Sequence, residues 1–456
     1  MATQTSPSPS RPLIVMCAMP EVGHTYPLLQ IATHLVSRSF AVFFVGGPQF
    51  ERQIRATGAA YHECQNFVTP ALGKRLHAIP DPKERHKFAI KHVFVDSIPL
   101  RCAALTRCLE DVRTRNPGRE VVVINEIMFL GALPYLFGAP PPRGYERFPR
   151  VINFHTSILV MGSAEVPPFL SNLEYDPSPE GQERNRLIYE EREPENREIQ
   201  AYANEVLRTL GATRELGGEF FQTAMMTGDV TLLPYSADLE YPRAELSEKF
   251  EFCGGLPLKQ VDPDFEYPAW WSEVTSNAAL PHDSADKKRV VFVTQGTVNN
   301  KPDQLIQPAL RGLAGLQDTL VITTLGKRGA ALSGDFDVPA NARVIDYLPY
   351  NAILPYADAF LFNGGFGGYM HSIMNGVPMV TAGTSEDKAE VSSRAAWAGV
   401  ALNLKTATPP ENVVKEAVQT VLTESKFKER VVAIKRENEA LDFMQHVDHW
   451  VWKLAE

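Results

Sequence analysis

The stretch that decides the fold is "DAFLFNGGFGGYMHSIMNGVPMV" at residues 358–380. The apolar run at 359–362 meets four glycines within five residues, and a helical pattern then continues to Gly376. A strand followed by a glycine-rich loop and a helix N-terminus gathers backbone N–H groups, which bind phosphate. The stretch therefore predicts a phosphate-binding loop. A Cβ at Gly365 or Gly367 is expected to displace this loop or to block a positive φ.

Apolar runs around this stretch predict a parallel sheet in the second half of the chain. Buried parallel strands are short continuous apolar runs, and helical patterns separate them here. The runs lie at 289–295, 319–325, 342–348, 359–362 and 378–382 in the second half, and at 13–19, 40–47 and 120–131 in the first. Two such series in succession predict an α/β fold, with two Rossmann-like doubly wound domains that face each other across a cleft.

Composition indicates where these domains begin and end. Residues 1–11 are rich in Ser and Pro, and we expect them to be disordered. The first domain is predicted at 12–253 and the second at 289–430. Between them, at 254–288, apolar periodicity lapses and Pro, Asp and Ser accumulate, which indicates a linker. The amphipathic segment 431–456 is expected to be a C-terminal helix that packs back on the first domain.

Charge and cysteine usage exclude several classes of protein. The 456 residues carry a formal net charge of −9 without a dense basic block, which argues against nucleic acid or an anionic membrane as the main partner. The five cysteines are odd in number and form no CxxC pair, so we expect free thiols in a reducing compartment. The sequence shows neither a signal peptide nor a membrane-spanning run of about 18 apolar residues, and the expected location is cytoplasmic.

A second loop of interest, "PEVGHTYP" at 20–27, directly follows the first predicted strand. A dinucleotide-binding domain would place a GxGxxG motif here, but the loop has only Gly23. The next residue, His24, is well placed to act as a general base at a strand–helix turn. On this loop alone, a histidine that caps the helix or packs locally is an equally good interpretation.

Together the two loops resemble those of the family 1 glycosyltransferases of the GT-B fold, which include UDP-sugar enzymes that modify small molecules. "PxxGHxxP" at 20–27 resembles the catalytic loop of that family. "FxxNGGxGGxxxSxxxGVPMV" at 360–380, with "EDK" at 386–388, resembles its nucleotide-sugar signature. The similarity covers the chain from about residue 12 to about residue 425 and implies the two-domain fold predicted above.

The resemblance also implies roles for individual residues. His24 matches the base that removes the proton of the acceptor hydroxyl, and Glu126 matches the acid that orients this base. Asn125 is the other possible alignment, and a carboxylate is preferred because it fixes the imidazole tautomer and stabilises its charged form. Thr297 matches a hydroxyl that touches the diphosphate, and Asp387 matches the acid that binds hydroxyls of the sugar. The remaining donor-binding positions are Gly23, Tyr347, Leu348, Asn363, Gly365, Gly367, Gly368, His371, Glu386 and Lys388.

Four of these positions differ from the family pattern. Asn363 stands where many relatives have His, and Tyr347 and Lys388 stand where plant relatives have Trp and Gln. His371 stands where relatives often have Glu that holds the ribose; it makes one such bond or is simply a helix residue. These differences bear on the choice of donor more than on the type of reaction.

The implied reaction is an inverting, metal-independent transfer of a hexose, with glucose as the expected sugar. The donor is a UDP-sugar co-substrate, and neither a permanently bound cofactor nor a metal is implied. The apolar segment 152–169, with Phe154, Met161 and Phe169, suits a small hydrophobic acceptor such as a phenol, polyketide or flavonoid, or it is ordinary core. His155 in this segment is expected to be a packed histidine. The alternatives are a sterol or lipid glucosyltransferase, a UDP-sugar epimerase of the same fold, and a non-catalytic nucleotide-sugar-binding protein.

Overall fold

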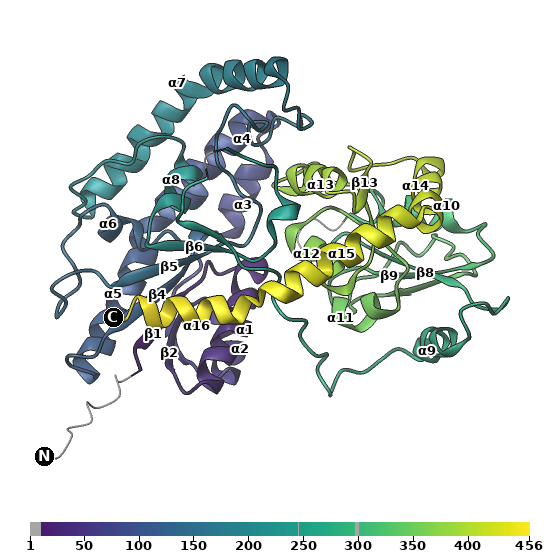
Figure 1. Ribbon diagram of the computed structural model, residues 1–456, viewed down its shortest axis with the longest axis horizontal. Coiled ribbons are helices and arrows are strands. Elements are labelled where there is room, and N and C mark those ends of the chain that lie inside the picture. The colour runs from purple at the N-terminus through teal and green to yellow at the C-terminus, as the bar shows by residue number, and fades with distance from the viewer. Residues whose placement is uncertain (1–10, 245, 297–300) are drawn as a thin grey trace, which may run out of the picture.

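Two parallel β-sheets with flanking helices make up the computed structural model, which describes residues 11–456 except 245 and 297–300 (Figure 1). The first sheet has the spatial order β3-β2-β1-β4-β5-β6-β7, and its strands are β1 (Leu13–Cys17), β2 (Ala41–Gly46), β3 (Ala60–Glu63), β4 (Val121–Glu126), β5 (Arg150–Phe154), β6 (Val230–Leu233) and β7 (Phe250–Phe252). The second has the order β10-β9-β8-β11-β12-β13, with β8 (Arg289–Thr294), β9 (Thr319–Thr324), β10 (Ala342–Ile345), β11 (Ala359–Phe362), β12 (Met379–Thr381) and β13 (Ala401–Asn403).

The predicted α/β architecture is confirmed, and each of the eight predicted runs contains a strand of one of these sheets. Five further strands, β3, β5, β6, β7 and β13, were not predicted. They are three to five residues long and lie towards the sheet edges, where a short run carries little periodicity. Both sheets reverse their strand order at the centre, between β1 and β4 and between β8 and β11. Ligands of such sheets bind beyond the strand ends at these points.

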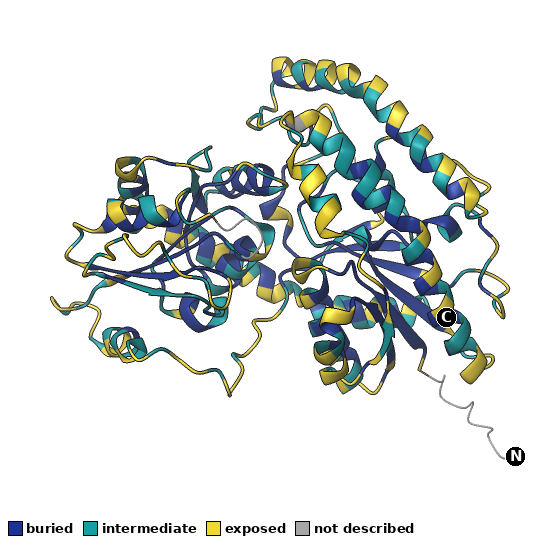
Figure 2. Cartoon of the chain, turned by 180° about the vertical axis from the view of Figure 1, so that it is seen from behind, coloured by how far each residue is buried: buried dark blue, intermediate teal, exposed yellow. Residues whose placement is uncertain are grey.

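Helices cover both sheets, and the strands beneath them are buried (Figure 2). Those associated with the first sheet are α1 (Val22–Ser37), α2 (Glu51–Ala56), α3 (Pro70–His77), α4 (Pro82–Ala89), α5 (Ile98–Arg115), α6 (Leu133–Leu136), α7 (Pro179–Thr209) and α8 (Phe220–Met226). Those that follow are α9 (Trp271–Ala279), α10 (Ile306–Leu313), α11 (Tyr350–Ile353), α12 (Phe366–Asn375), α13 (Lys388–Trp397), α14 (Glu411–Thr423), α15 (Ser425–Leu441) and α16 (Phe443–Lys453). In the described part of the chain, no helix has the length and apolarity needed to cross a bilayer.

The segment predicted as a linker is partly helical and packs against the second sheet's domain. Its helix α9 starts with Trp271, whose ring stacks on Tyr267 at 4.7 Å between centroids and meets Tyr356 edge-on at 5.8 Å. Glu273 of the same helix pairs with Arg343, with Nε and Oε2 2.8 Å apart. Aromatic packing and one ion pair therefore hold this segment in place.

The C-terminal segment consists of two helices that bridge the two halves of the molecule, shown in yellow in Figure 1. Residue 431, the predicted start of a single helix, lies inside α15, and α15 packs on α12 of the second half. The chain bends at Asp442, which has a φ of 52°. From there α16 packs on α1 of the first half, where Phe443 meets Phe154 at 5.6 Å between ring centroids.

Buried ion pairs also join the two halves. Arg394 of α13 donates from Nε to both carboxylate oxygens of Glu240, at 2.8 and 2.9 Å, and from Nη1 to Glu390 at 3.1 Å. The side chains of Arg394 and Glu240 are only 3% and 2% exposed. Because the Glu240 segment follows β6 and α13 begins beside the predicted sugar-binding loop, this pair fixes the second-domain loop relative to the first sheet.

Candidate active site

A histidine–carboxylate pair lies at the centre of the first sheet, where β1 and β4 end side by side. His24 is in the first turn of α1, and Glu126 is the last residue of β4. The Nδ1 atom of His24 lies 2.9 Å from Oε1 of Glu126. An ionised carboxylate only accepts hydrogen bonds, so Nδ1 carries the hydrogen and Nε2 is left with the lone pair. The side chain of His24 is 28% exposed, which leaves the ring accessible.

Glu126 is fully buried, and hydrogen-bond donors surround it. Besides His24, its carboxylate accepts from the backbone amides of Met19 at 3.2 Å and Met128 at 3.0 Å, and from Oγ1 of Thr156 at 3.0 Å. Burial raises the pKa of Glu126, but the charge and hydrogen bond of His24 and the two amides lower it by more, so it lies below the usual range. Glu126 is therefore an ionised partner for His24.

Glu126 in turn changes the basicity of His24. Burial lowers the pKa of His24, whereas the charge and hydrogen bond of Glu126 raise it, followed by the charges of Asp387 and Glu21. The net result is a pKa above the ordinary value of 6.5. Asp387 accepts a hydrogen bond from Ser157, whose neighbour Thr156 contacts His24, so the second-domain loop lies close to the histidine.

Asn125, the alternative partner, faces a different neighbour. Its Nδ2 donates to Oδ1 of Asn153 at 3.0 Å, inside the sheet between β4 and β5. Successive side chains of a strand point to opposite faces, so only one of residues 125 and 126 can meet His24. In this structure that residue is Glu126.

The predicted acceptor segment divides into core and surface. Phe154 is buried in the core against α16, and Met161 and Phe169 are half-buried. His155 is fully buried; its Nδ1 accepts the amide of Ser157 at 3.0 Å, and burial lowers its pKa to about 4. His155 is therefore a neutral, packed histidine, and of the three apolar residues only Met161 and Phe169 remain available to an acceptor.

The glycine-rich loop presents the N-terminus of α12. Gly365 caps the helix, and Tyr369 is the residue whose amide makes the bond to the Gly365 carbonyl. The amides of residues 366–368 come before that bond and point out of the helix end, where they can bind an anion. A Cβ at Gly367 would meet no atom of the described residues within 4 Å, so these residues leave space in front of the helix end.

The expectation of a positive φ at Gly365 or Gly367 is wrong. Gly365 has an extended backbone with φ −68°, and Gly367 lies within α12. The residue in the left-handed region is Gly364, with a φ of 77°, and a Cβ there would lie 2.3 Å from Oγ of Ser392. At Gly368 a Cβ would lie 2.9 Å from the Phe362 ring. Gly364 and Gly368 thus serve the turn and the packing, and Gly365 and Gly367 leave room at the helix end.

Asn363 connects the two central strands of the second sheet. Its Nδ2 donates to the backbone carbonyl of Gln295, which follows β8, while Asn363 itself follows β11. Gly296, the next residue after Gln295, has a φ of 73° and turns the chain there. Thr297, predicted to touch the diphosphate, lies outside the described residues.

Three consecutive residues, Glu386, Asp387 and Lys388, form the end of the other predicted donor loop. Asp387 precedes α13, and its Oδ2 accepts a hydrogen bond from Oγ of Ser157 in the first domain. Lys388 is 8% exposed and donates from Nζ to Glu386 and, at 3.2 Å, to Ser385. The Lys388 charge is thus matched by Glu386, whereas Asp387 faces the first domain.

The remaining predicted positions lie around the same strand ends. The Tyr347 ring lies 5.0 Å from the Arg328 guanidinium, and the buried Leu348 donates its amide to Oγ1 of Thr324 at 3.1 Å. Burial lowers the pKa of His371 to about 4, so this histidine is neutral, and its ring meets Tyr350 edge-on at 5.4 Å. Gly23 is exposed, and a Cβ there would meet none of the described atoms within 4 Å.

Sequence reasoning missed two polar residues of this site, Thr156 and Ser157. Thr156 contacts both His24 and Glu126, and Ser157 contacts Asp387. Both follow β5, the strand next to β4. The signal for them is a pair of polar residues directly after an apolar run, but this run lies within the segment 152–169, which is predicted to contact the acceptor.

One cluster in the described part of the chain has the side chains for a metal ion, away from the residues above. It consists of Glu251, Cys253 and His446, whose potential ligand atoms all lie within 4.8 Å of one another. Nδ1 of His446 already lies 2.5 Å from Oε1 of Glu251, and Trp450 donates to the other oxygen. These contacts dock α16 on the end of β7, and Sγ of Cys253 donates to the backbone carbonyl of Glu251 at 3.2 Å.

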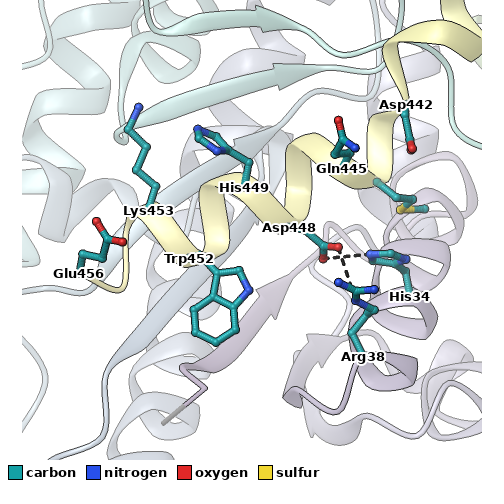
Figure 3. A pocket seen from close by; sticks show the side chains of 10 residues that line it. His34, Arg38, Asp442, Gln445, Asp448, His449, Trp452, Lys453 and Glu456 are labelled. Carbon is teal, nitrogen blue, oxygen red and sulfur yellow. Dashed lines mark hydrogen bonds and ion pairs between the residues drawn. The ribbon is translucent and has the colours of Figure 1, made fainter. Parts of the chain in front are cut away.

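A surface groove of about 710 Å³ lies between α1 and α16 (Figure 3). Asp448 at its centre pairs with Nε2 of His34 at 3.0 Å and with Nε of Arg38 at 3.6 Å. His34 is ten residues after His24, or about 15 Å farther along the helix. None of the predicted site residues lines this groove, so it is separate from the candidate active site.

Comparison with known proteins shows the family. The sequence profile described as "UDP-glucoronosyl and UDP-glucosyl transferase" matches residues 205–442. UDP-glucosyltransferase 1 of Beauveria bassiana (strain ARSEF 2860) is 38% identical over 99% of both chains. UDP-glucosyltransferase B1 of Starmerella bombicola is 34% identical over 98% of this chain and 99% of its own. The chain belongs to this family and is a glycosyltransferase.

Solved structures agree with the fold. The glycotransferase of kitacinnamycin superimposes with a TM-score of 0.72 at 18% identity, over 98% of this chain and 100% of its own. The calicheamicin glycosyltransferase CalG4 gives a TM-score of 0.68 at 16% identity, over 98% of each chain. The predicted GT-B fold and the resemblance to family 1 glycosyltransferases are therefore confirmed.

Proposed function

We propose that the protein transfers glucose from UDP-glucose to a hydroxyl of a small hydrophobic acceptor, with His24 as the general base and inversion at the anomeric carbon. The observation that carries this proposal is the His24–Glu126 pair of the first domain, which contacts Thr156, while the next residue, Ser157, donates a hydrogen bond to Asp387 of the second domain. The base and the predicted sugar-binding acid are thus brought together from opposite halves of the chain.

The proposed mechanism assigns one task to each side of this site. Nε2 of His24 takes the proton of the acceptor hydroxyl while the oxygen attacks C1 of the sugar. The bond from C1 to the diphosphate oxygen breaks, and UDP leaves with the bonding electrons. Because attack and departure occur on opposite faces of C1, the anomeric configuration inverts. The imidazolium that forms is stabilised by the ionised Glu126.

The proposed role of the glycine-rich loop is to stabilise the negative charge on the leaving UDP. The open amides at residues 366–368 and the dipole of α12 favour an anion at the helix N-terminus. These groups act as fixed electrostatic stabilisers of the leaving group, which is why we propose a metal-independent reaction.

Glucose is proposed because the similar proteins of Beauveria bassiana and Starmerella bombicola are named UDP-glucosyltransferases. A small-molecule acceptor is proposed because another relative, at 30% identity, is named 4'-demethylrebeccamycin synthase. The half-buried Met161 and Phe169 support an apolar acceptor surface. Membership of a transferase family disfavours the epimerase and the non-catalytic alternatives, and a sterol or lipid acceptor is a variant of the proposal.

The deciding experiment is incubation with UDP-glucose and a panel of phenols, polyketides, flavonoids, sterols and hydroxy fatty acids. Mass spectrometry detects the glucoside, and NMR gives its anomeric configuration and also reveals any UDP-galactose, which has the same mass as UDP-glucose. We expect a β-glucoside from the α-linked donor. Replacement of His24 by Ala should lower kcat by about 10²–10⁴-fold and leave UDP binding intact. A variant that turns over within about threefold of wild type would rule out His24 as the base.

A further inference from the structure

The hydroxyl of Thr156 lies between the two members of the proposed catalytic pair. Its Oγ1 is 3.0 Å from Oε1 of Glu126 and 3.1 Å from Nδ1 of His24. The direct Nδ1–Oε1 distance is 2.9 Å, so the three polar atoms form a nearly equilateral triangle. Thr156 is 132 residues away from His24 in the sequence and 30 from Glu126.

The direction of each hydrogen bond in this triangle follows from what its atoms can donate. The ionised carboxylate of Glu126 has no hydrogen, so the Thr156 hydroxyl donates to it. The oxygen of that hydroxyl keeps its lone pairs, so the single hydrogen on Nδ1 of His24 is shared between this oxygen and Oε1 of Glu126. Thr156 therefore supplies a donor to the acid and an acceptor to the base at the same time.

The two residues adjacent to Thr156 in the chain, His155 and Ser157, fix its backbone through hydrogen bonds. The amide of Ser157 donates to Nδ1 of the fully buried His155, and Oγ of Ser157 donates to Asp387 of the second domain. The amide of His155 donates to the carbonyl of Leu232 in β6. The Thr156 hydroxyl is thus attached to an ordered backbone, as a preorganised contact requires.

We propose that Thr156 is a positioning residue of the active site, which fixes the His24 ring and the Glu126 carboxylate at one mutual angle so that Nε2 faces the acceptor hydroxyl. This inference rests on the proposed function of His24. A single hydrogen bond to a carboxylate lets the imidazole rotate about the Nδ1–Oε1 direction. The second acceptor removes that freedom, and catalysis by a general base is sensitive to such placement.

The test compares acceptors that need a base with one that does not. A nitrophenol assayed at a pH where it is already ionised has no proton for His24 to remove, whereas an alcohol or a weakly acidic phenol does. Thr156→Val keeps the shape and removes the hydroxyl. We expect it to lower kcat for the un-ionised acceptors by about 2–10-fold, as for one lost hydrogen bond, and to leave kcat for the nitrophenolate and KM for the donor unchanged.

Two further variants separate positioning from a general effect on the fold. Thr156→Ser restores the hydroxyl, so it should recover the wild-type rate with un-ionised acceptors. Thr231→Val is the matched control: Thr231 lies on β6, is fully buried and donates to the carbonyl of Met225 at 2.8 Å, and it should affect neither class of acceptor. In a His24→Ala background, Thr156→Val should cause no further loss, because the group it positions is absent.

Two results would overturn the proposal while leaving the proposed function in place. One is an equal loss for ionised and un-ionised acceptors in Thr156→Val. The other is a Thr156→Ser variant as slow as Thr156→Val. A wild-type enzyme that transfers sugar to no acceptor would instead overturn the proposed function, and the role of Thr156 with it.

Discussion

Replacing Glu126 by Gln should change the pH dependence of the enzyme as well as its rate. Gln has nearly the shape of Glu but no charge, and its amide group has one acceptor oxygen where the carboxylate has two. In the structure the carboxylate receives four donors and is fully buried, so solvent cannot replace the lost charge. His24 remains in place but loses its ionic partner.

The size and sign of the effect follow from the surroundings of His24. A hydrogen bond to a charged group is worth about 1.5–3 kcal/mol, so kcat should fall by about 10- to 150-fold. In the wild type burial lowers the pKa of His24, but the charge and hydrogen bond of Glu126, together with the charges of Asp387 and Glu21, raise it above 6.5. The variant lacks the Glu126 charge, so the pKa of His24 should fall. The base works when it is neutral, so the acid limb of kcat/KM should move to lower pH.

The assay is kcat/KM for an un-ionised acceptor, measured from about pH 5 to 9. Asn125→Ala is the matched control, because the Asn125 side chain faces Asn153 and should leave the acid limb where it is. An unmoved acid limb in Glu126→Gln would contradict the reasoning. A moved limb in Asn125→Ala, with Glu126→Gln behaving like wild type, would transfer the orienting role to Asn125.

Three further outcomes are expected. Gly367→Val should keep the fold, since a Cβ there meets none of the described atoms, but it should weaken UDP binding at least tenfold, or about 1.4 kcal/mol, in calorimetric titration; wild-type affinity would mean that the helix end does not hold the diphosphate. Prolonged EDTA treatment should leave the transfer rate unchanged, and a strict requirement for Mg²⁺ or Mn²⁺ would reveal a metal site that the proposal lacks. Glu240→Ala leaves Arg394 with Glu390 alone, so urea unfolding should show a loss of about 3 kcal/mol, and a loss below about 1 kcal/mol would show that water reaches this pair.

The sequence by itself determined the elements that depend only on residues adjacent in the chain. The apolar runs give the strands because a buried parallel strand needs only a short continuous apolar stretch. The two strand-end loops, with His24 and with Gly365 and Gly367, are likewise local patterns of glycine and polar residues after a strand. Their spacing along the chain was enough to indicate two doubly wound domains and the family.

Tertiary structure alone decided which side chains meet. Whether residue 125 or 126 faces His24 depends on the phase of β4 relative to β1, since a shift of one residue turns every side chain to the other face. The positive φ lies at Gly364, in place of the one expected at Gly365 or Gly367, and Ser392 on α13 occupies the space that a Cβ at Gly364 would need. Thr156 reaches His24 only because β5 pairs with β4 in parallel register, which places two loops 132 residues apart at the same edge of the sheet.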